Sequence, residues 1–163
     1  MYYKKIILSL SILLIISRVV FSQEIINIKD TSDLNKIKSE NKNNVLLINF
    51  WATWCRPCTE EFPGLVKLYK NYKDNDFKLI FISLDFKEEI ETKLKPFLVN
   101  SGVDFPVYYL NTKNQDAIMN YFDEKWDGGI PATFIFDKNG QIVKEVIGSK
   151  DYDFFNNEIK KLY

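Results

Sequence analysis

Two cysteines, Cys55 and Cys58, stand three positions apart in the segment NFWATWCRPC, and the chain of 163 residues contains no others. Thiols at this spacing can form a disulfide and reopen it, so redox chemistry is the first expectation. The chain has no histidine, which excludes a histidine-activated serine or cysteine nucleophile. A structural zinc ion wants four Cys or His ligands, and only two are present. We therefore expect no metal and no cofactor besides the cysteine pair.

A purely structural disulfide is the alternative for this pair. A bridge between positions 55 and 58 closes a very small loop. The stabilisation that a disulfide gives grows with the length of the loop it closes, so this bridge would stabilise the fold little. The spacing favours a redox centre.

The cysteines stand between a predicted buried strand and a predicted helix. The run VLLINF (45–50) is continuously apolar, as in a strand that is covered on both faces. After the cysteines, apolar residues recur at helical spacing and predict a helix over about 56–72, kinked at Pro63. Pro57 stiffens the first turn without cost to the helix.

This placement predicts different roles for the two sulfurs. At a helix N-terminus, unpaired N–H groups and the positive end of the dipole favour a thiolate, and Arg56 adds a positive charge. We expect the pKa of the Cys55 thiol to be lowered, although Glu60 and Glu61 oppose this. Cys55 is the predicted nucleophile. Cys58, one turn further and more buried, is the predicted resolving cysteine that opens the mixed disulfide.

Strands and helices alternate along the rest of the chain, which predicts an α/β sheet with helices on both faces. Further strands are predicted over 24–29 at an edge, over 77–84 and 103–110, and over 132–137 and 141–147 as a hairpin turning at Asn139-Gly140. Helices are predicted from Thr31 as N-cap, over 87–102 with a bend at Pro96, over 114–122 and over 151–163. Pro106 places the strand 103–110 toward an edge of the sheet.

The first 22 residues differ from the rest of the chain. A charged start, an apolar run from Ile6 to Ile16 and a small-residue site ending at Ser22 predict a secretory signal peptide, followed by one domain over 23–163. The alternative is an uncleaved segment that anchors the protein in the inner membrane, although the run is short for a span. In both cases the folded part lies outside the cytoplasm, in the periplasm or secreted.

The charge balance argues against a nucleic-acid partner. The whole chain carries 22 basic and 22 acidic residues, and residues 1–22 hold three of the basic ones and no acid. The domain is therefore slightly acidic, and it shows no basic patch.

Two segments carry a resemblance to a known family. FWATWCRPC (50–58) resembles the active-site segment of the thioredoxin superfamily, and GGIPATFIFDKNG (128–140) resembles its second signature. The WCxPC start, the following EEFP and the extra β-α insert near 86–126 are most similar to the extracytoplasmic TlpA/ResA-like thiol–disulfide oxidoreductases. This resemblance, which covers about 40–163, implies a thioredoxin-like fold: a central mixed β-sheet with helices on both faces and an extra βα insert before a cis-proline loop.

The resemblance also implies where a substrate binds. Pro131 is expected to be cis and to pack beside the cysteines, and the backbone of Ile130 can pair with an extended substrate as an added strand. Trp54 is expected to shape the site and to contact the substrate. Trp51 either shields the site or packs in the core, and for Trp126 packing is favoured.

One position departs from the cytoplasmic thioredoxins, which carry a buried aspartate where this chain has Asn49. Asparagine cannot accept the Cys58 proton. TlpA/ResA-like proteins often use an acid near the end of the next strand, and Asp85 is the candidate here, with a solvated helix N-cap as its alternative role. Glu88 and Glu89 remain open as alternatives.

The function that the resemblance implies is reduction of disulfides in extracytoplasmic proteins by dithiol exchange, with a role in cytochrome c maturation. It implies a membrane thiol donor that supplies the electrons, and we expect the protein to be a monomer. A disulfide oxidase or isomerase would share these residues and differ in potential. A peroxiredoxin-like antioxidant protein has superficial support in PCTEE, but the PxxxTxxC segment of peroxiredoxins is absent. A binding module with the same fold would not need the thiols.

Overall fold

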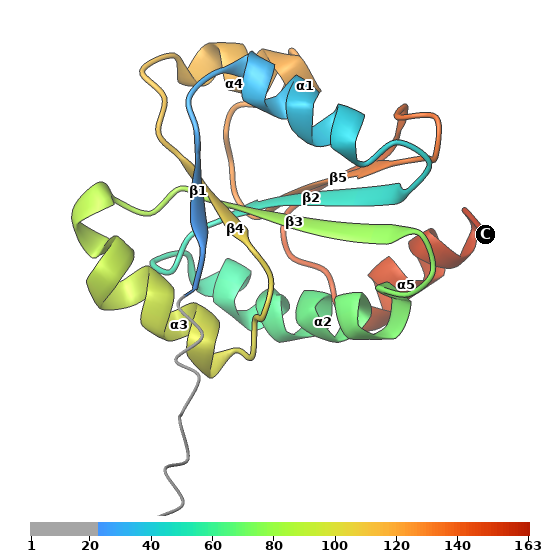
Figure 1. The fold of residues 1–163 in the computed structure, drawn as a ribbon, viewed down its shortest axis with the longest axis horizontal. Coiled ribbons are helices and arrows are strands. Elements are labelled where there is room, and N and C mark those ends of the chain that lie inside the picture. The colour runs from blue at the N-terminus through green and yellow to red at the C-terminus, as the bar shows by residue number, and fades with distance from the viewer. Residues whose placement is uncertain (1–22) are drawn as a thin grey trace, which may run out of the picture.

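The computed structural model describes residues 23–163, so the predicted signal peptide lies outside the described residues. Within 23–163 the strands form one sheet in the order β1-β4-β3-β2-β5-β6 (Figure 1). Its strands are β1 (Ile25–Ile28), β2 (Val45–Trp51), β3 (Phe77–Ser83), β4 (Val107–Leu110), β5 (Ala132–Phe136) and β6 (Ile142–Ile147). The α-helices are α1 (Thr31–Glu40), α2 (Arg56–Tyr72), α3 (Lys95–Asn100), α4 (Gln115–Phe122) and α5 (Tyr152–Lys160).

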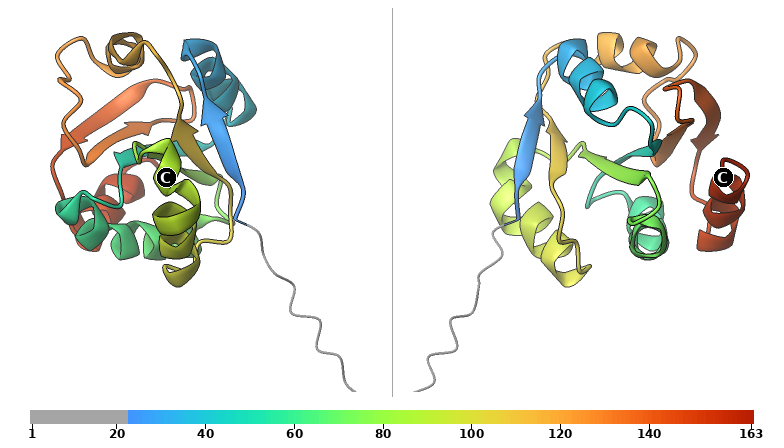
Figure 2. Two further views of the ribbon diagram at one scale, coloured as in Figure 1. Left: turned by 90° about the vertical axis from the view of Figure 1, so that its left-hand side faces the viewer. Right: turned by 45° about the vertical axis from the view of Figure 1, so that its right-hand side comes forward.

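The sheet is mixed, and β2 lies inside it. β2 pairs in parallel with β3 and antiparallel with β5, and every one of its side chains is buried. Alternate residues of a strand point to opposite faces, so Leu47 joins the core beneath α2 and α5 while Ile48 joins the core beneath α1 and α4. Figures 1 and 2 show α1 and α4 on one face and α2, α3 and α5 on the other. The continuous apolar run is thus explained by burial on both faces.

The helix that contains Cys58 has the predicted extent. α2 begins at Arg56, ends at Tyr72 and continues through Pro63 as one helix. Its buried face includes Phe62, Leu65 and Leu68, which pack in the core against β2 and β3. This packing fixes the start of α2, and with it the cysteine pair, at the carboxyl end of β2.

The predicted helix over 87–102 is not continuous. It consists of a 3₁₀ turn (Lys87–Glu89), a π-helical turn (Ile90–Leu94) and then α3, in whose first turn Pro96 lies. Proline has no N–H to donate to the preceding turn, so the regular α-helical ladder starts only around Pro96.

Two further predictions are wrong. The strand 103–110 begins at Val107, after Pro106, and lies between β1 and β3 instead of at an edge, because β1 covers its outer side in parallel register. The N-cap of α1 is Asp30, whose carboxylate accepts a hydrogen bond from the Ser32 N–H, and Thr31 is the first helical residue. The edge position of β1 is as predicted.

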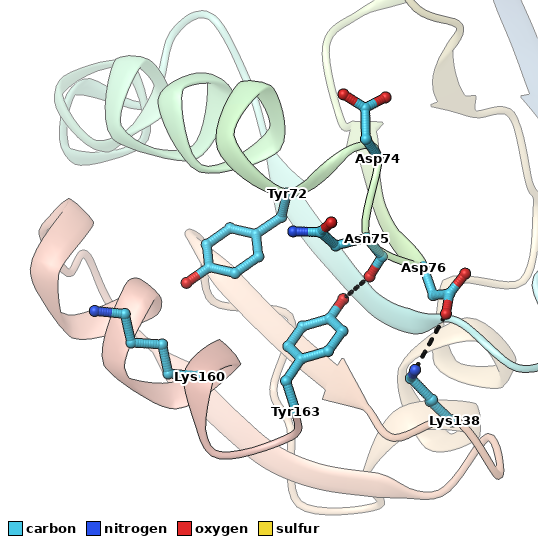
Figure 3. A pocket seen from close by; sticks show the side chains of 7 residues that line it. All are labelled: Tyr72, Asp74, Asn75, Asp76, Lys138, Lys160 and Tyr163. Atoms are coloured by element: carbon cyan, nitrogen blue, oxygen red, sulfur yellow. Dashed lines mark hydrogen bonds and ion pairs between the residues drawn. The ribbon is translucent and has the colours of Figure 1, made fainter.

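A cavity of about 490 Å³ lies at the end of the sheet opposite the cysteines, beside Tyr72, the β5–β6 turn and Tyr163 (Figure 3). Lys138 pairs with Asp76 at 3.2 Å, and the Tyr163 hydroxyl donates to the Asn75 carbonyl. The first pair joins the β5–β6 turn, and the second joins the last residue, to the loop between α2 and β3.

Candidate active site

The two cysteines form a disulfide at the start of α2. The S–S distance is 1.98 Å and the Cα atoms are 5.2 Å apart. Cys55 is the N-cap of α2, and the Cys58 N–H donates to the Cys55 Sγ at 3.3 Å. A backbone N–H that faces a sulfur favours its ionised form, so the helix start supports a thiolate at Cys55 once the bridge is reduced.

The charged neighbours of the pair lie on the surface. Arg56 Nε and Glu60 Oε1 are 2.8 Å apart, and both side chains are largely exposed. Because the Arg56 charge is paired and solvated, it contributes less to a thiolate at Cys55 than the N–H groups of the helix do.

The peptide bond between Ile130 and Pro131 is cis, and it lies immediately before β5. The Cys55 Sγ lies 3.8 Å from the Ile130 carbonyl oxygen. The Trp126 Nε1–H donates to the Gly129 carbonyl at 2.9 Å and the Gly148 N–H donates to the Pro131 carbonyl at 2.8 Å, so the loop is held on both sides. The structure therefore brings Ile130 and Pro131 beside the reactive sulfur.

The three tryptophans have different environments. Trp54, which precedes Cys55, is 53 % exposed. Trp51 is fully buried and packs against Phe62, with ring centroids 4.4 Å apart, so it belongs to the core. Trp126 is also buried, and through its bond to Gly129 it supports the cis-proline loop.

Asp85 is buried, and its hydrogen-bond partners are Thr53 and Ser83 instead of Cys58. Its carboxylate accepts hydrogen bonds from the Thr53 N–H at 3.0 Å and from the Ser83 hydroxyl at 2.7 Å. It therefore ties the end of β3 to the loop before Cys55. It is not a helix N-cap either, because the following 3₁₀ turn is capped by Phe86.

The other two candidate acids have different surroundings. Glu88 is exposed, and Glu89 pairs with Lys93. Within the described residues 23–163, none of the carboxylates of Asp85, Glu88 and Glu89 is hydrogen-bonded to Cys58.

Glu61 is a further buried carboxyl group, with only 5 % of its surface exposed. The sequence alone did not predict it as a proton acceptor. Its Oε1 accepts from Asn49 Nδ2 at 3.1 Å and its Oε2 accepts from the Lys150 N–H at 2.7 Å. Asn49 Nδ2 also donates to Thr133 Oγ1 at 2.9 Å. Glu61 stands three positions after Cys58 on α2, so the two side chains share a helix face.

Burial raises the pKa of Glu61 to about 7, although the hydrogen bonds from Lys150 and Asn49 oppose this shift. A carboxyl group that titrates near neutral pH can both accept and return a proton there. The signal for Glu61 was its spacing: positions 58, 61, 62 and 65 all lie on the buried face of α2. Its position near Cys55 alone indicates only a negative charge that opposes a thiolate there.

The described residues 23–163 contain no cluster of His, Cys, Asp or Glu that could hold a metal ion. Among the helices in that range, none has the length and apolar character needed to cross a membrane.

Comparison with known proteins gives consistent matches. The model of the AhpC/TSA family matches residues 23–145. The thiol-disulfide oxidoreductase ResA of Bacillus thuringiensis (strain Al Hakam) is 32 % identical over 121 residues, which cover 74 % of this chain and 65 % of that relative. ResA of Bacillus subtilis (strain 168) is 30 % identical over 133 residues, covering 79 % of this chain and 69 % of the relative. The matched region thus spans about two thirds of the length of these relatives.

Solved structures share the fold. A thiol:disulfide interchange protein of the thioredoxin family from Chlorobium tepidum TLS superposes with a TM-score of 0.65 at 24 % identity, covering 77 % of this chain and 83 % of that one. StoA from Bacillus subtilis superposes with a TM-score of 0.55 at 22 % identity, covering 71 % and 82 %. The predicted thioredoxin-like α/β fold is confirmed.

Proposed function

Since the chain belongs to the AhpC/TSA family, we propose that it is a thiol–disulfide oxidoreductase that reduces disulfides in proteins outside the cytoplasm. The observation that carries the proposal is the Cys55–Cys58 disulfide at the start of α2, beside the Ile130–Pro131 peptide. The relatives that are named thiol-disulfide oxidoreductases support the same chemistry.

The first step needs the reduced protein. The Cys55 thiolate attacks one sulfur of a substrate disulfide, a new S–S bond forms between Cys55 and the substrate, and the second substrate sulfur leaves as a thiolate. The Cys58 N–H, which already faces the Cys55 Sγ, stabilises the attacking thiolate. The Ile130 backbone lies where it can pair with the substrate chain on either side of its cysteine.

The second step regenerates the disulfide that the structure contains. Cys58 loses its proton and attacks the Cys55 Sγ, the mixed disulfide breaks, and the substrate leaves with both of its sulfurs reduced. Two electrons pass from the cysteine pair to the substrate, and the departing thiolates take up protons. Glu61 is the proposed acceptor of the Cys58 proton, because it is buried on the same helix face and titrates near neutral pH.

Repeated turnover requires that an external dithiol reduces the Cys55–Cys58 bridge again. We propose a membrane thiol donor as this reductant and apocytochrome c as a substrate, in line with the sequence resemblance. The proposed site of action is extracytoplasmic, with residues 1–22 as signal peptide or anchor and the domain acting as a monomer.

Insulin reduction by dithiothreitol tests the proposal. We expect the wild-type protein to accelerate insulin precipitation and Cys55→Ser to be inactive, with Thr59→Ser as a control that keeps both sulfurs. Equal rates for Cys55→Ser and wild type would refute the enzymatic role.

The direction of electron flow is tested by the reduction potential of the pair. A reductant is expected to lie near the thioredoxin value of about −270 mV, whereas an oxidase would lie near the DsbA value of about −120 mV. A potential near the second value would replace the reductase proposal with an oxidase.

A further inference from the structure

Two aromatic side chains next to the disulfide are exposed to water. Trp54 is 53 % exposed and Phe86 is 63 % exposed. Their rings stack with centroids 6.5 Å apart and an interplanar angle of 29°. We call Trp54 and Phe86 the aromatic platform. Its two rings come from different loops, so the platform is a product of the fold and not of one sequence motif.

The aromatic platform and the cis-proline loop flank Cys55 on opposite sides. Trp54 directly precedes Cys55, and Phe86 follows the end of β3. β3 lies on one side of β2, and β5, which begins after Pro131, lies on the other. Strands are spaced by about 4.8 Å, so β3 and β5 are about 10 Å apart, which is the reach of about three extended residues. A chain that meets Ile130 at one end can therefore reach Phe86 at the other.

The two loops that carry the aromatic platform are tied together before any substrate arrives. Thr53 and Asp85 precede the two aromatic residues in the sequence, and the Thr53 N–H and hydroxyl both donate to the Asp85 carboxylate. The Ser83 hydroxyl donates to the same carboxylate at 2.7 Å. Hydrogen bonds thus fasten the two loops together at the residues that directly precede Trp54 and Phe86. A surface that is already ordered loses little conformational entropy when it binds.

We propose that the aromatic platform binds an apolar side chain of the polypeptide substrate, next to the disulfide that is reduced, and that Phe86 is a specificity-determining residue. This inference rests on the proposed function. Stacked apolar rings in water favour contact with apolar groups, because such contact removes both surfaces from water. The occupant is the disulfide-bearing polypeptide, since its sulfur has to reach Cys55, and a chain placed there continues over Trp54.

The test compares three disulfides. Two are peptides that differ in one position near the cystine, which is leucine in one and alanine in the other, and the third is bis(2-hydroxyethyl) disulfide. For Phe86→Ala we expect kcat/KM to fall about fivefold on the leucine peptide, with little change on the alanine peptide and the small disulfide. Phe86→Leu should restore most of the loss. Ile142→Ala is the control, because Ile142 is an exposed apolar residue at the opposite end of β5 and β6.

The outcomes separate this inference from the proposed function. If wild type reduces none of the three disulfides, both fail. If wild type reduces them and Phe86→Ala slows all three alike or none, the inference alone is overturned. The inference is also overturned if the aromatic platform joins two copies of the chain. In that case sedimentation would show a concentration-dependent dimer that Phe86→Ala abolishes.

Discussion

At the residue scale, two buried carboxyl groups near the disulfide have different partners and therefore different roles. Asp85 accepts hydrogen bonds from the Thr53 N–H and the Ser83 hydroxyl, which ties the loop before Cys55 to the end of β3. Glu61 is bonded by the Asn49 amide and the Lys150 N–H, and burial raises its pKa to about 7. The sequence alone favoured Asp85 as the proton acceptor. The surroundings of Glu61 could not be predicted, because they depend on how α2 packs on β2 and on the loop after β6.

Glu61→Gln is expected to slow disulfide reduction by tenfold or more at neutral pH, because the amide cannot accept the Cys58 proton. In wild type, kcat/KM should rise with pH through an inflection near pH 7, where Glu61 ionises, and the variant should lose this inflection. Stopped-flow reduction of a peptide disulfide across pH 5 to 9 measures both effects. Glu60→Gln, which removes an exposed neighbouring charge, should behave as wild type.

The same raised pKa predicts a stability effect. Glu61 binds its proton more tightly in the folded protein than in the unfolded chain, where the ordinary value is 4.5. The free energy of unfolding should therefore fall as pH rises from about 4.5 through about 7, by on the order of 3 kcal/mol from this group. Urea unfolding should show Glu61→Gln gaining stability relative to wild type over that range. A constant difference between the two proteins from pH 4 to 8 would contradict the raised pKa.

At the scale of elements, the site is assembled from four segments that meet at one end of the sheet. β2 leads into the cysteines, α2 carries both sulfurs at its start, β3 delivers Asp85 and Phe86, and β5 begins at Pro131. β2, β3 and α2 could be predicted from apolar continuity and helical spacing, because burial alone dictates those patterns. The position of β4 could not, because it depends on the pairing of β4 with β1 far away in the sequence.

Asp85→Ala is expected to lower the free energy of unfolding by about 2 kcal/mol, because it leaves the Thr53 N–H and the Ser83 hydroxyl without their acceptor. It should also slow reduction of all disulfides, including small ones, since the loop before Cys55 loses its anchor. Chemical denaturation and turnover of bis(2-hydroxyethyl) disulfide measure the two effects. The matched variant Glu88→Ala removes an exposed acid three positions later and should change neither quantity.

At the scale of the whole molecule, the fold and the family were predictable because two short segments, 50–58 and 128–140, carry signatures that are far apart in sequence and adjacent in the structure. The fold is confirmed by the solved structures, and the family by the AhpC/TSA match and the ResA relatives. Two apolar cores, one on each face of the sheet, hold this frame together. We therefore expect the domain to fold without the disulfide.

Replacement of both cysteines by alanine should leave a folded domain. A bridge that spans positions 55 and 58 closes too small a loop to contribute more than about 2 kcal/mol. We expect cooperative thermal unfolding and an unchanged far-ultraviolet circular dichroism spectrum for the double variant. A variant without cooperative unfolding would show that the disulfide is a structural bridge.

The most direct test of the central claim is a trap for the mixed disulfide. Reduced Cys58→Ser and reduced Cys55→Ser are each mixed with a disulfide-bearing protein substrate, quenched with acid and analysed by mass spectrometry. Because Cys55 attacks and Cys58 resolves, Cys58→Ser should accumulate a substrate adduct on Cys55, and Cys55→Ser should accumulate none. An adduct on Cys58 in the Cys55→Ser protein, with none in the Cys58→Ser protein, would contradict the assignment of the two sulfurs.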